Sequence, residues 1–388
     1  MTPMEVYQMS TEIKAAVAKK TLWGIIVFYL LIAFEIFYMA GPFAVYFYGI
    51  YNPILNFFNQ SPVLITLNSF FLPHVAVETS SAFINARNHI GGILALGGFI
   101  VFLIGACQIY YSKFKRKGAV LNGIYKYIRH PQYVFFAVCG FGLLILWPRY
   151  INLLMYITML FVYYALAKAE EKECEEKFGK SYIEYKNRTN MFFPIKHTLI
   201  KNVSLLPKSG GKRVMVILAL YVFALILGFG IAKSVHTHSI NSLYTVSSDN
   251  FVTVSISRVD NDRIEQIMSI ALSNEEVKNV VNMEDRNTLF LNYILPVEWF
   301  AAEIPMNGIV YRQGHRSPSN HNNFLYKIIF TSVETRGNEN VTGKEILANV
   351  MTRSPLLEVW VDLRENMVTQ ILEIPEEYKY KGIPVAVY

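Results

Sequence analysis

The chain has 388 residues, of which 53% are hydrophobic and 17% are charged, with a formal net charge of +7. Soluble globular proteins carry about 25% charged residues, and the apolar residues here gather in long uncharged runs. This excludes a soluble enzyme, a disordered chain and a secreted disulfide scaffold, and it predicts an integral membrane protein. The cysteines Cys107, Cys139 and Cys174 form no CxxC pair, so we expect free thiols and no metal site.

Five apolar stretches are long enough to cross a bilayer, either alone or as a tight pair, because a spanning helix needs about 20 apolar residues. They are residues 21–48, 88–112, 132–148, 150–167 and 214–232. Only Arg149 separates the third stretch from the fourth, which predicts two antiparallel helices joined by a tight turn. Residues 62–77 form a shorter stretch that contains Pro62 and Pro73. It is expected to be re-entrant or interfacial rather than spanning.

The charges are distributed unevenly along the chain. Residues 113–131 carry six Lys/Arg and no acid, whereas fourteen bases face nineteen acids from residue 233 onward. Basic short loops stay on the cytoplasmic side of a membrane. We therefore expect a cytoplasmic N-terminus, cytoplasmic basic loops and an extracytoplasmic tail, provided that residues 62–77 do not cross. Beside membrane spans, the basic loops favour anionic lipid headgroups over nucleic acid.

The residues after the last span have the composition of a soluble domain. Four segments, residues 244–257, 325–333, 356–363 and 367–374, are rich in β-branched and aromatic residues, and the last two predict a hairpin. Residues 260–281 show helical spacing, with Asp260 as the expected N-cap. The predicted fold is an α-helical membrane bundle of about five spans followed by a soluble α+β domain.

The expected division of the chain follows from these patterns. Residues 1–88 form an N-terminal membrane segment, 89–200 a membrane core, 201–233 a linker with the last span, and 234–388 the extracytoplasmic domain. Glu35 lies within the first span, where an ionisable residue either serves function or pairs with a neighbouring helix. His236 and His238 share one face if they lie on a strand, but no third metal ligand accompanies them.

The stretch most informative about chemistry is residues 122–133, NGIYKYIRHPQY, which enters a membrane helix from a basic loop. Pro131 suits the first turn of that helix, where no N–H is needed. The free backbone N–H groups of this turn, together with Arg129 and His130, form a site for a carboxylate.

A second informative stretch, residues 169–179 (AEEKECEEKFG), follows the predicted helical pair and ends at Gly179, which suits a helix C′ position. Because the two intervening spans are nearly equal in length, Glu170 and Glu171 are predicted to return to the membrane face on which His130 lies. Cation-binding acids and an anion-binding loop then face each other at the cytoplasmic interface.

These residues resemble the isoprenylcysteine carboxyl methyltransferase and phospholipid methyltransferase superfamily of integral membrane enzymes. Its signature is Gly-x-Tyr-x-x-x-Arg-His-Pro-x-Tyr, then a helical pair, Glu-Glu, Phe-Gly-x-x-Tyr-x-x-Tyr and a proline. The matching positions, which span about residues 100–194, are Gly123, Tyr125, Arg129, His130, Pro131, Tyr133, Glu170, Glu171, Phe178, Gly179, Tyr182, Tyr185 and Pro194.

The resemblance implies S-adenosylmethionine (SAM) as the cofactor, in a cytoplasm-facing pocket, and a lipophilic methyl acceptor that enters from the bilayer. By position it implies cofactor contacts with Gly118, Ala119, Val120, Tyr125, His130, Pro131, Gln132, Tyr133 and Glu170. The expected catalytic residues are Arg129, Lys168 and Glu171. In-line methyl transfer from a sulfonium needs positioning and a dry pocket rather than a covalent intermediate.

Two positions depart from the family pattern. Phe135 stands where a glycine is often found, and Leu166 stands where the isoprenylcysteine enzymes place an arginine for the substrate carboxylate. The acceptor therefore stays open between a prenylated thiol, a phospholipid amine, a small thiol and another lipid.

Two other functions remain open. One is an NADPH-dependent reductase related to membrane sterol reductases, which place an Arg-Asp pair where this chain has Ala169 and Glu170. The other is a non-catalytic membrane anchor for an external domain that binds an envelope or extracellular partner.

Overall fold

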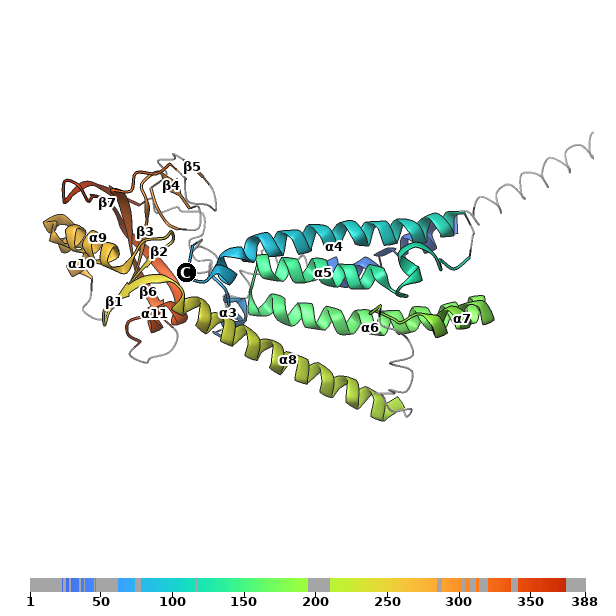
Figure 1. Ribbon diagram of the computed structural model, residues 1–388. Helices are drawn as coiled ribbons and strands as arrows, with labels where there is room; N and C mark the ends of the chain where they lie inside the picture. Colours follow the sequence, from blue (N-terminus) through green and yellow to red (C-terminus); the bar gives the residue numbers. More distant parts are fainter. Residues whose placement is uncertain are drawn as a thin grey trace, which may run out of the picture.

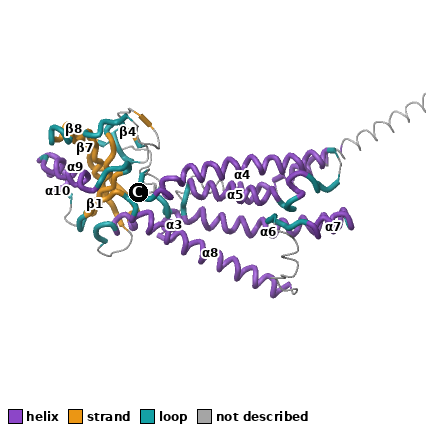
Figure 2. The backbone as a smooth tube through the Cα atoms, in the orientation of Figure 1, coloured by secondary structure: helices purple, strands orange, loops and turns teal. Residues whose placement is uncertain are grey.

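The computed structural model combines a helical bundle at one end with a β-sheet unit at the other (Figures 1 and 2). It describes parts of residues 23–46, and residues 62–73, 78–115, 118–194, 210–284, 288–301, 304–307, 312–313, 320–335 and 341–374. Within these ranges three helices are long and apolar enough to cross a membrane: α4 (Ala82–Phe114), α6 (Tyr150–Phe178) and α8 (Gly210–Asn241). The chain is therefore a multi-pass integral membrane protein.

Helix α4 packs closely against α5 (Pro131–Leu146) because glycines form the contact. Gly91, Gly98 and Gly105 lie seven residues apart, so they share one face of α4. A Cβ atom on Gly98 would lie 2.6 Å from the backbone nitrogen of Cys139, which leaves no room for a side chain. Close approach through small residues is a main source of helix packing in lipid.

The predicted antiparallel pair is present: α5 ends at Leu146 and α6 begins after Arg149, at the end of the bundle that faces the sheet (Figure 1). The buried Arg149 side chain donates from Nη1 to the Asn68 carbonyl oxygen (3.1 Å) and to Asn68 Oδ1 (2.5 Å). It thereby holds α3 (Pro62–Asn68) at this end. With seven residues α3 is too short to span a bilayer, as expected for this part of residues 62–77.

An apolar helix, Tyr29–Ala44, packs against α4, α5 and α6. Its buried face is marked by Ile32 and Met39, and seven residues further along by Tyr46, whose hydroxyl donates to the Gly140 carbonyl oxygen (2.9 Å). The Glu35 prediction falls outside the described residues.

Helix α8 contacts α6 from about Tyr221 toward its C-terminal end and diverges from α6 toward Gly210 (Figure 1). Tyr221 and Thr158 share a hydroxyl hydrogen bond of 2.9 Å, and Gly228 lies beside Ile157. The helix runs beyond the apolar stretch to Asn241, so His236 and His238 lie on a helix rather than on a strand.

The sheet unit follows α8 directly and has the strand order β1-β2-β3-β6-β7-β8. The strands are β1 (Tyr244–Ser247), β2 (Phe251–Ser255), β3 (Leu289–Pro296), β6 (Leu325–Thr335), β7 (Val350–Asp362) and β8 (Met367–Glu373). Strands β2 and β3 are parallel, whereas the other neighbours are antiparallel. A short second sheet joins β4 (Trp299–Phe300) to β5 (Arg312–Gln313).

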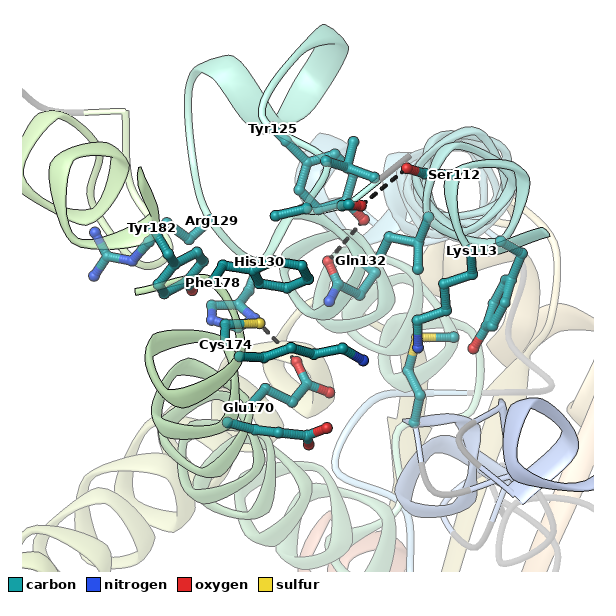
Figure 3. Close-up of a pocket in the computed structure, with 18 of the residues that line it drawn as sticks. Ser112, Lys113, Tyr125, Arg129, His130, Gln132, Glu170, Cys174, Phe178 and Tyr182 are labelled. Carbon is teal, nitrogen blue, oxygen red and sulfur yellow. Dashed lines mark hydrogen bonds and ion pairs between the residues drawn. The ribbon is translucent and has the colours of Figure 1, made fainter. Parts of the chain in front are cut away.

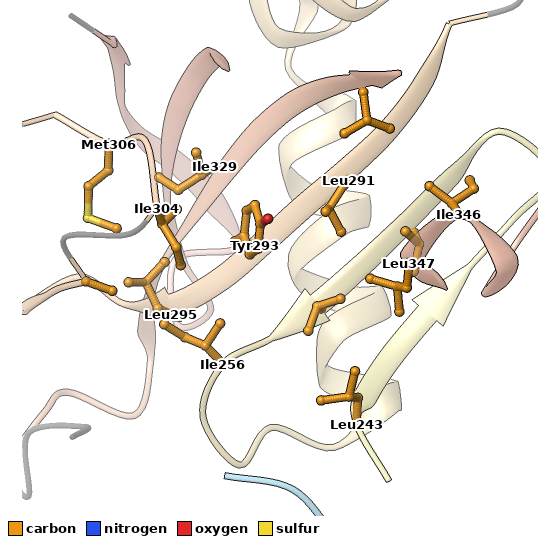
Figure 4. Packing of buried hydrophobic residues seen from close by; sticks show 14 of the residues in the cluster. Leu243, Ile256, Leu291, Tyr293, Leu295, Ile304, Met306, Ile329, Ile346 and Leu347 are labelled. Atoms are coloured by element: carbon orange, nitrogen blue, oxygen red, sulfur yellow. The ribbon is translucent and has the colours of Figure 1, made fainter. Parts of the chain in front are cut away.

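A hydrophobic core packs against each face of the six-stranded sheet, whereas the edge strand β8 is largely exposed. Helices α9 (Asn261–Ser273) and α10 (Glu275–Met283) cover one face, and α11 (Glu345–Asn349) covers part of the other. On the second face, Leu291 and Leu295 of β3 belong to one hydrophobic cluster with Ile346 and Leu347 of α11. Leu243, before β1, belongs to the same cluster (Figure 4). Alternation along β3 sends its side chains to both cores.

The segment with helical spacing after β2 differs from the expectation. Residues 260–281 do not form a single helix, because the chain breaks at Asn274, whose side-chain oxygen accepts hydrogen bonds from the N–H groups of Glu276 (2.9 Å) and Val277 (3.3 Å). This is an N-cap, and it starts α10. Asp260 is the N-cap residue of α9, as predicted, although its side chain makes no capping hydrogen bond.

Candidate active site

A cavity of about 590 Å³ lies at the end of the bundle farthest from the sheet, between the helix Tyr29–Ala44, α4, the turn η1 (Gly123–Lys126), α6 and α7 (Lys180–Arg188) (Figures 1 and 3). This volume suits a small-molecule ligand. One part of the wall is polar and includes Tyr125, His130, Gln132 and Glu170. Another part is apolar and includes Leu31, Ile32, Met39 and Ile109.

The loop between α4 and η1 lines the cavity with residues that have small side chains. Gly118 and Gly123 have φ values of +86° and +67°, a region that favours glycine. The Ser112 hydroxyl donates to the Gly118 carbonyl oxygen (3.1 Å). A Cβ on Gly123 would lie 2.6 Å from the Gln108 side chain. These contacts hold the loop against the end of α4.

Tyr125 connects this loop to the first turn of α5. Its buried hydroxyl hydrogen-bonds the side-chain oxygen of Gln132 (3.1 Å) and the carbonyl oxygen of Gly105 (3.2 Å). Because Gly105 has no side chain, Ile124 and the Tyr125 hydroxyl can approach α4 closely: an added Cβ would lie 2.9 Å from Ile124 Cδ1 and 3.6 Å from the Tyr125 hydroxyl.

Glu170 is an acidic side chain that two other side chains hold at the cavity wall. Its carboxylate accepts a hydrogen bond from the Tyr133 hydroxyl, and its Oε2 lies 3.3 Å from Nδ1 of His130. Its side chain is 31% exposed, so it faces the cavity rather than the core. Burial by itself lowers the pKa of His130, but the neighbouring carboxylates of Glu170 and Glu171 outweigh burial and raise it above its ordinary value.

Glu171 lies behind the wall, with a side chain only 1% exposed. Its carboxylate is 2.6 Å from Nε of Arg129, 3.1 Å from Nζ of Lys186 and 3.8 Å from Nζ of Lys168. A buried carboxylate is tolerated when cations surround it in this way. Glu171 thereby ties the loop before α5 to α7.

Helix α7 folds back along the end of α6, because Gly179 between them has a φ of +55°. Its Tyr182 and Tyr185 line the cavity, and the Tyr185 hydroxyl donates to the carbonyl oxygen of Tyr125 (2.6 Å). The chain after α7 then runs beside the motif: the N–H of Arg129 donates to Asn190 (3.0 Å) and that of His130 to Met191 (3.1 Å).

The structure brings most of the sequence-predicted residues to this one cavity. Those that line it are Gly118, Ala119, Val120, Tyr125, Arg129, His130, Gln132 and Glu170. Four predicted residues are not part of the lining: Pro131 starts α5, Tyr133 supports Glu170, and Lys168 and Glu171 belong to the ion-pair group beside it. Phe135 is also absent from the lining, and Leu166 is buried between the helices.

Sequence reasoning missed the apolar wall and several polar residues of the cavity. Leu31, Ile32 and Met39 come from a helix far from the motif, and no local pattern distinguishes them from lipid-facing residues. Lys113, Cys174 and Lys177 lie at the ends of α4 and α6 and also line the cavity. Within the described ranges, no group of three or more His, Cys, Asp or Glu side chains is arranged to hold a metal ion.

Comparison with known proteins identifies the segment that builds the site. Residues 89–181 match the phospholipid methyltransferase family, whose methyltransferases use SAM. The chain is 33% identical over 76 residues to the protein-S-isoprenylcysteine O-methyltransferase of Saccharomyces cerevisiae. That stretch is 19% of this chain and 32% of the yeast protein, so the chain spans about a third of this relative. No solved structure matches the chain at a significant level.

Proposed function

Because residues 89–181 match the phospholipid methyltransferase family, we propose that this chain is a SAM-dependent methyltransferase whose reaction takes place in the cavity at the end of the bundle. The observation that carries the proposal is the Glu170 carboxylate, which Tyr133 and His130 hold at the wall of that cavity. A fixed carboxylate in a partly dry site attracts a cationic ligand, and SAM carries a sulfonium and an ammonium group.

The residues of the polar wall fit such a cofactor. Glu170 offers a charged acceptor, Gln132 offers an amide, and Gly118 has open space where a Cβ would be. SAM supplies an electrophilic methyl group for in-line displacement. The residues of the chain bind and orient the two reactants and exclude water, so no covalent intermediate on the protein is required.

The apolar wall supports a lipophilic acceptor. Ile32 and Met39 of the N-terminal helix contribute to it, in the same cavity whose polar wall carries Glu170. An acceptor dissolved in the bilayer would place its apolar chain there and its nucleophile toward the cofactor. The isoprenylcysteine enzymes carry an arginine at the position of Leu166. Since leucine has no charge to select a headgroup, we propose a lipophilic nucleophile as the acceptor without assigning its headgroup.

Arg129 and Glu171 are proposed to act by positioning the site. Arg129 donates to Glu171, to the Lys186 carbonyl oxygen (3.0 Å) and to the Thr189 carbonyl oxygen. Together with Lys168, they stabilise the loop that presents His130. The cavity is proposed to face the cytoplasm and the sheet unit the opposite side, because the basic loops surround the cavity end of the bundle.

Calorimetric titration of the detergent-solubilised protein with S-adenosylhomocysteine (SAH) tests the proposal, with NADPH titrated in parallel. We expect SAH to bind and the Glu170→Ala variant to lose most of that binding. Binding of NADPH alone would assign the protein to the reductases. If folded protein binds neither, the methyltransferase proposal fails and the sheet unit becomes the candidate for function.

A further inference from the structure

Helix α7 lies almost entirely beyond residues 89–181, yet it completes the wall of the cavity with Tyr182 and Tyr185. Lys186 on this helix reaches back to α6. Its Nζ lies 3.1 Å from Oε2 of Glu171 and donates a hydrogen bond to Glu175. The two carboxylates lie four residues apart on α6, so they share one face of that helix and are bridged by a single ammonium group.

We propose that Lys186 is a positioning residue of the active site, which fastens α7 across the mouth of the cavity and so slows the release of the bound cofactor. The inference rests on the proposed function. It assigns Lys186 no contact with the reacting atoms. Lys186 acts through the tyrosines of α7, which it holds at the wall, and through Glu171, which it helps to neutralise.

One side chain makes the ion pairs that join α7 to α6. Among the residues that the structure describes, both ion pairs between α6 and α7 belong to Lys186. The connection between the helices is Gly179, which has a φ of +55° and nothing within 4 Å of an added Cβ, so local hydrogen bonds rather than side-chain packing on that side support the turn. Without Lys186, α7 would keep hydrogen bonds from the Ser181 hydroxyl to the Phe178 carbonyl oxygen and from the Tyr185 hydroxyl to Tyr125. The contact of Arg129 with the Lys186 carbonyl oxygen and the packing of the buried Tyr182 would also remain, but no ion pair to α6 among the described residues would.

The burial of the partners predicts which property changes when Lys186 is removed. Lys186 is 33% exposed, so solvent screens it and its loss costs less than the loss of a buried charge. Arg129 remains 2.6 Å from Glu171 and still neutralises that buried carboxylate. The fold is therefore expected to survive, whereas α7 separates from α6 more often.

The test measures SAH affinity by calorimetry and SAH dissociation by stopped flow, in the full-length protein. Lys186→Met is expected to release SAH about tenfold faster, because α7 would separate from α6 more often and the opening of such an element limits ligand release in many enzymes. Lys186→Arg restores a cation that reaches both carboxylates and should be close to wild type. Arg188→Met is the matched control, since Arg188 lies on the same helix in an exposed ion pair with Glu184.

Two results would overturn the proposal: wild-type dissociation in Lys186→Met, or equal defects in Lys186→Met and Lys186→Arg. Should Lys186→Met fail to fold, Lys186→Gln is measured instead, because it keeps a hydrogen-bond donor. A second readout needs no cofactor: with the native Cys107, Cys139 and Cys174 replaced by alanine, spin labels on cysteines introduced at the exposed Ser181 and Tyr127 report the distance from α7 to the motif loop. A broadened distance distribution is expected in Lys186→Met, and an unchanged one would contradict the fastening role.

The two proposals fail in different ways. If wild-type protein does not bind SAH, the proposed function falls, while the spin-label distances still decide whether Lys186 fastens α7. If wild type binds SAH and Glu170→Ala does not, but Lys186→Met behaves as wild type, only the role of Lys186 is wrong.

Discussion

Glu170 and Glu171 are adjacent in sequence but have opposite surroundings. Successive residues on an α-helix point about 100° apart, so one carboxylate faces the cavity and the other faces Arg129. Glu170 is paired with a tyrosine hydroxyl and a histidine, whereas Glu171 is enclosed by cations. Glu170 therefore presents its carboxylate to the cavity, whereas Glu171 connects the loop before α5 to α7.

Replacing Glu170 by glutamine should weaken SAH binding by roughly tenfold or more, because a charge-assisted contact is replaced by a neutral one. Calorimetric titration measures the effect. Glu176→Gln is the matched control, since Glu176 lies on the same helix and its side chain is 69% exposed. Equal losses in the two variants would indicate a general charge effect and contradict a specific role for Glu170.

The raised pKa of His130 predicts how stability depends on pH. A group whose pKa is higher in the folded state stabilises the fold below its unfolded pKa, here about 6.5, and loses that contribution as the pH rises through the folded value. The melting temperature of His130→Gln should therefore fall furthest below wild type near pH 6, and the difference should shrink toward pH 9. A difference that grows with pH would contradict the pairing of a charged His130 with Glu170 and Glu171.

At the scale of elements, glycine decides how near α4 lies to α5. Gly98 faces the backbone of α5, whereas its neighbour Gly97 has nothing within 4 Å of an added Cβ. The same face of α4 carries Gly105, against which Tyr125 of the cavity rests. The packing of α4 on α5 and the shape of the site therefore both depend on the glycines along one face of α4, Gly91, Gly98 and Gly105.

Gly98→Leu should lower the melting temperature clearly, since forcing extra volume into packed helices costs about 1–3 kcal/mol or more. Gly97→Leu serves as the control and should melt close to wild type, because its side chain would extend into open space. Thermal unfolding in detergent, followed by light scattering, compares the two. Similar melting of both variants would show that α4 and α5 are not closely packed.

At the scale of the whole molecule, the cavity and the sheet lie at opposite ends of the bundle (Figure 1). The sheet unit is tied to the segment before α4 as well as to α8. The N–H of Ser80 donates to the Ser242 carbonyl oxygen (2.8 Å), and Glu78 accepts from the N–H of Arg258 (2.9 Å). Helices α4 and α8 thus share one anchoring point at the sheet end.

This arrangement predicts the topology of the chain in the membrane. Because α8 is a single apolar helix that carries the basic pair Lys212 and Arg213 in its first turn and leads to the sheet at its other end, a reporter that is active only outside the cytoplasm should work when fused after Tyr388. The same reporter fused after Pro194 should be inactive. Activity of both fusions would place the cavity outside the cytoplasm and remove access to a cytoplasmic cofactor.

Local patterns in the sequence were sufficient for the parts of the fold that depend on near neighbours. Apolar runs predicted the long helices, the turn at Arg149 predicted the antiparallel pair, and the segments around residues 364–366 predicted the β7–β8 hairpin. The strand β3, central in the sheet, was not singled out, because its residues pair with β2 and β6 from distant parts of the chain. The break at Asn274 depends on a single side-chain cap, which helical spacing does not reveal.

For the candidate site, the sequence by itself predicted part of the polar wall, since Tyr125, His130 and Glu170 belong to a motif whose spacing is meaningful without coordinates. Only the tertiary structure decided the rest. It separated Glu170 from Glu171, supplied the apolar wall from the N-terminal helix, and brought Lys186 back to α6 through the turn at Gly179. The physical reason is that these contacts depend on burial and on the direction of folded-back helices, which the sequence spacing of a motif does not encode.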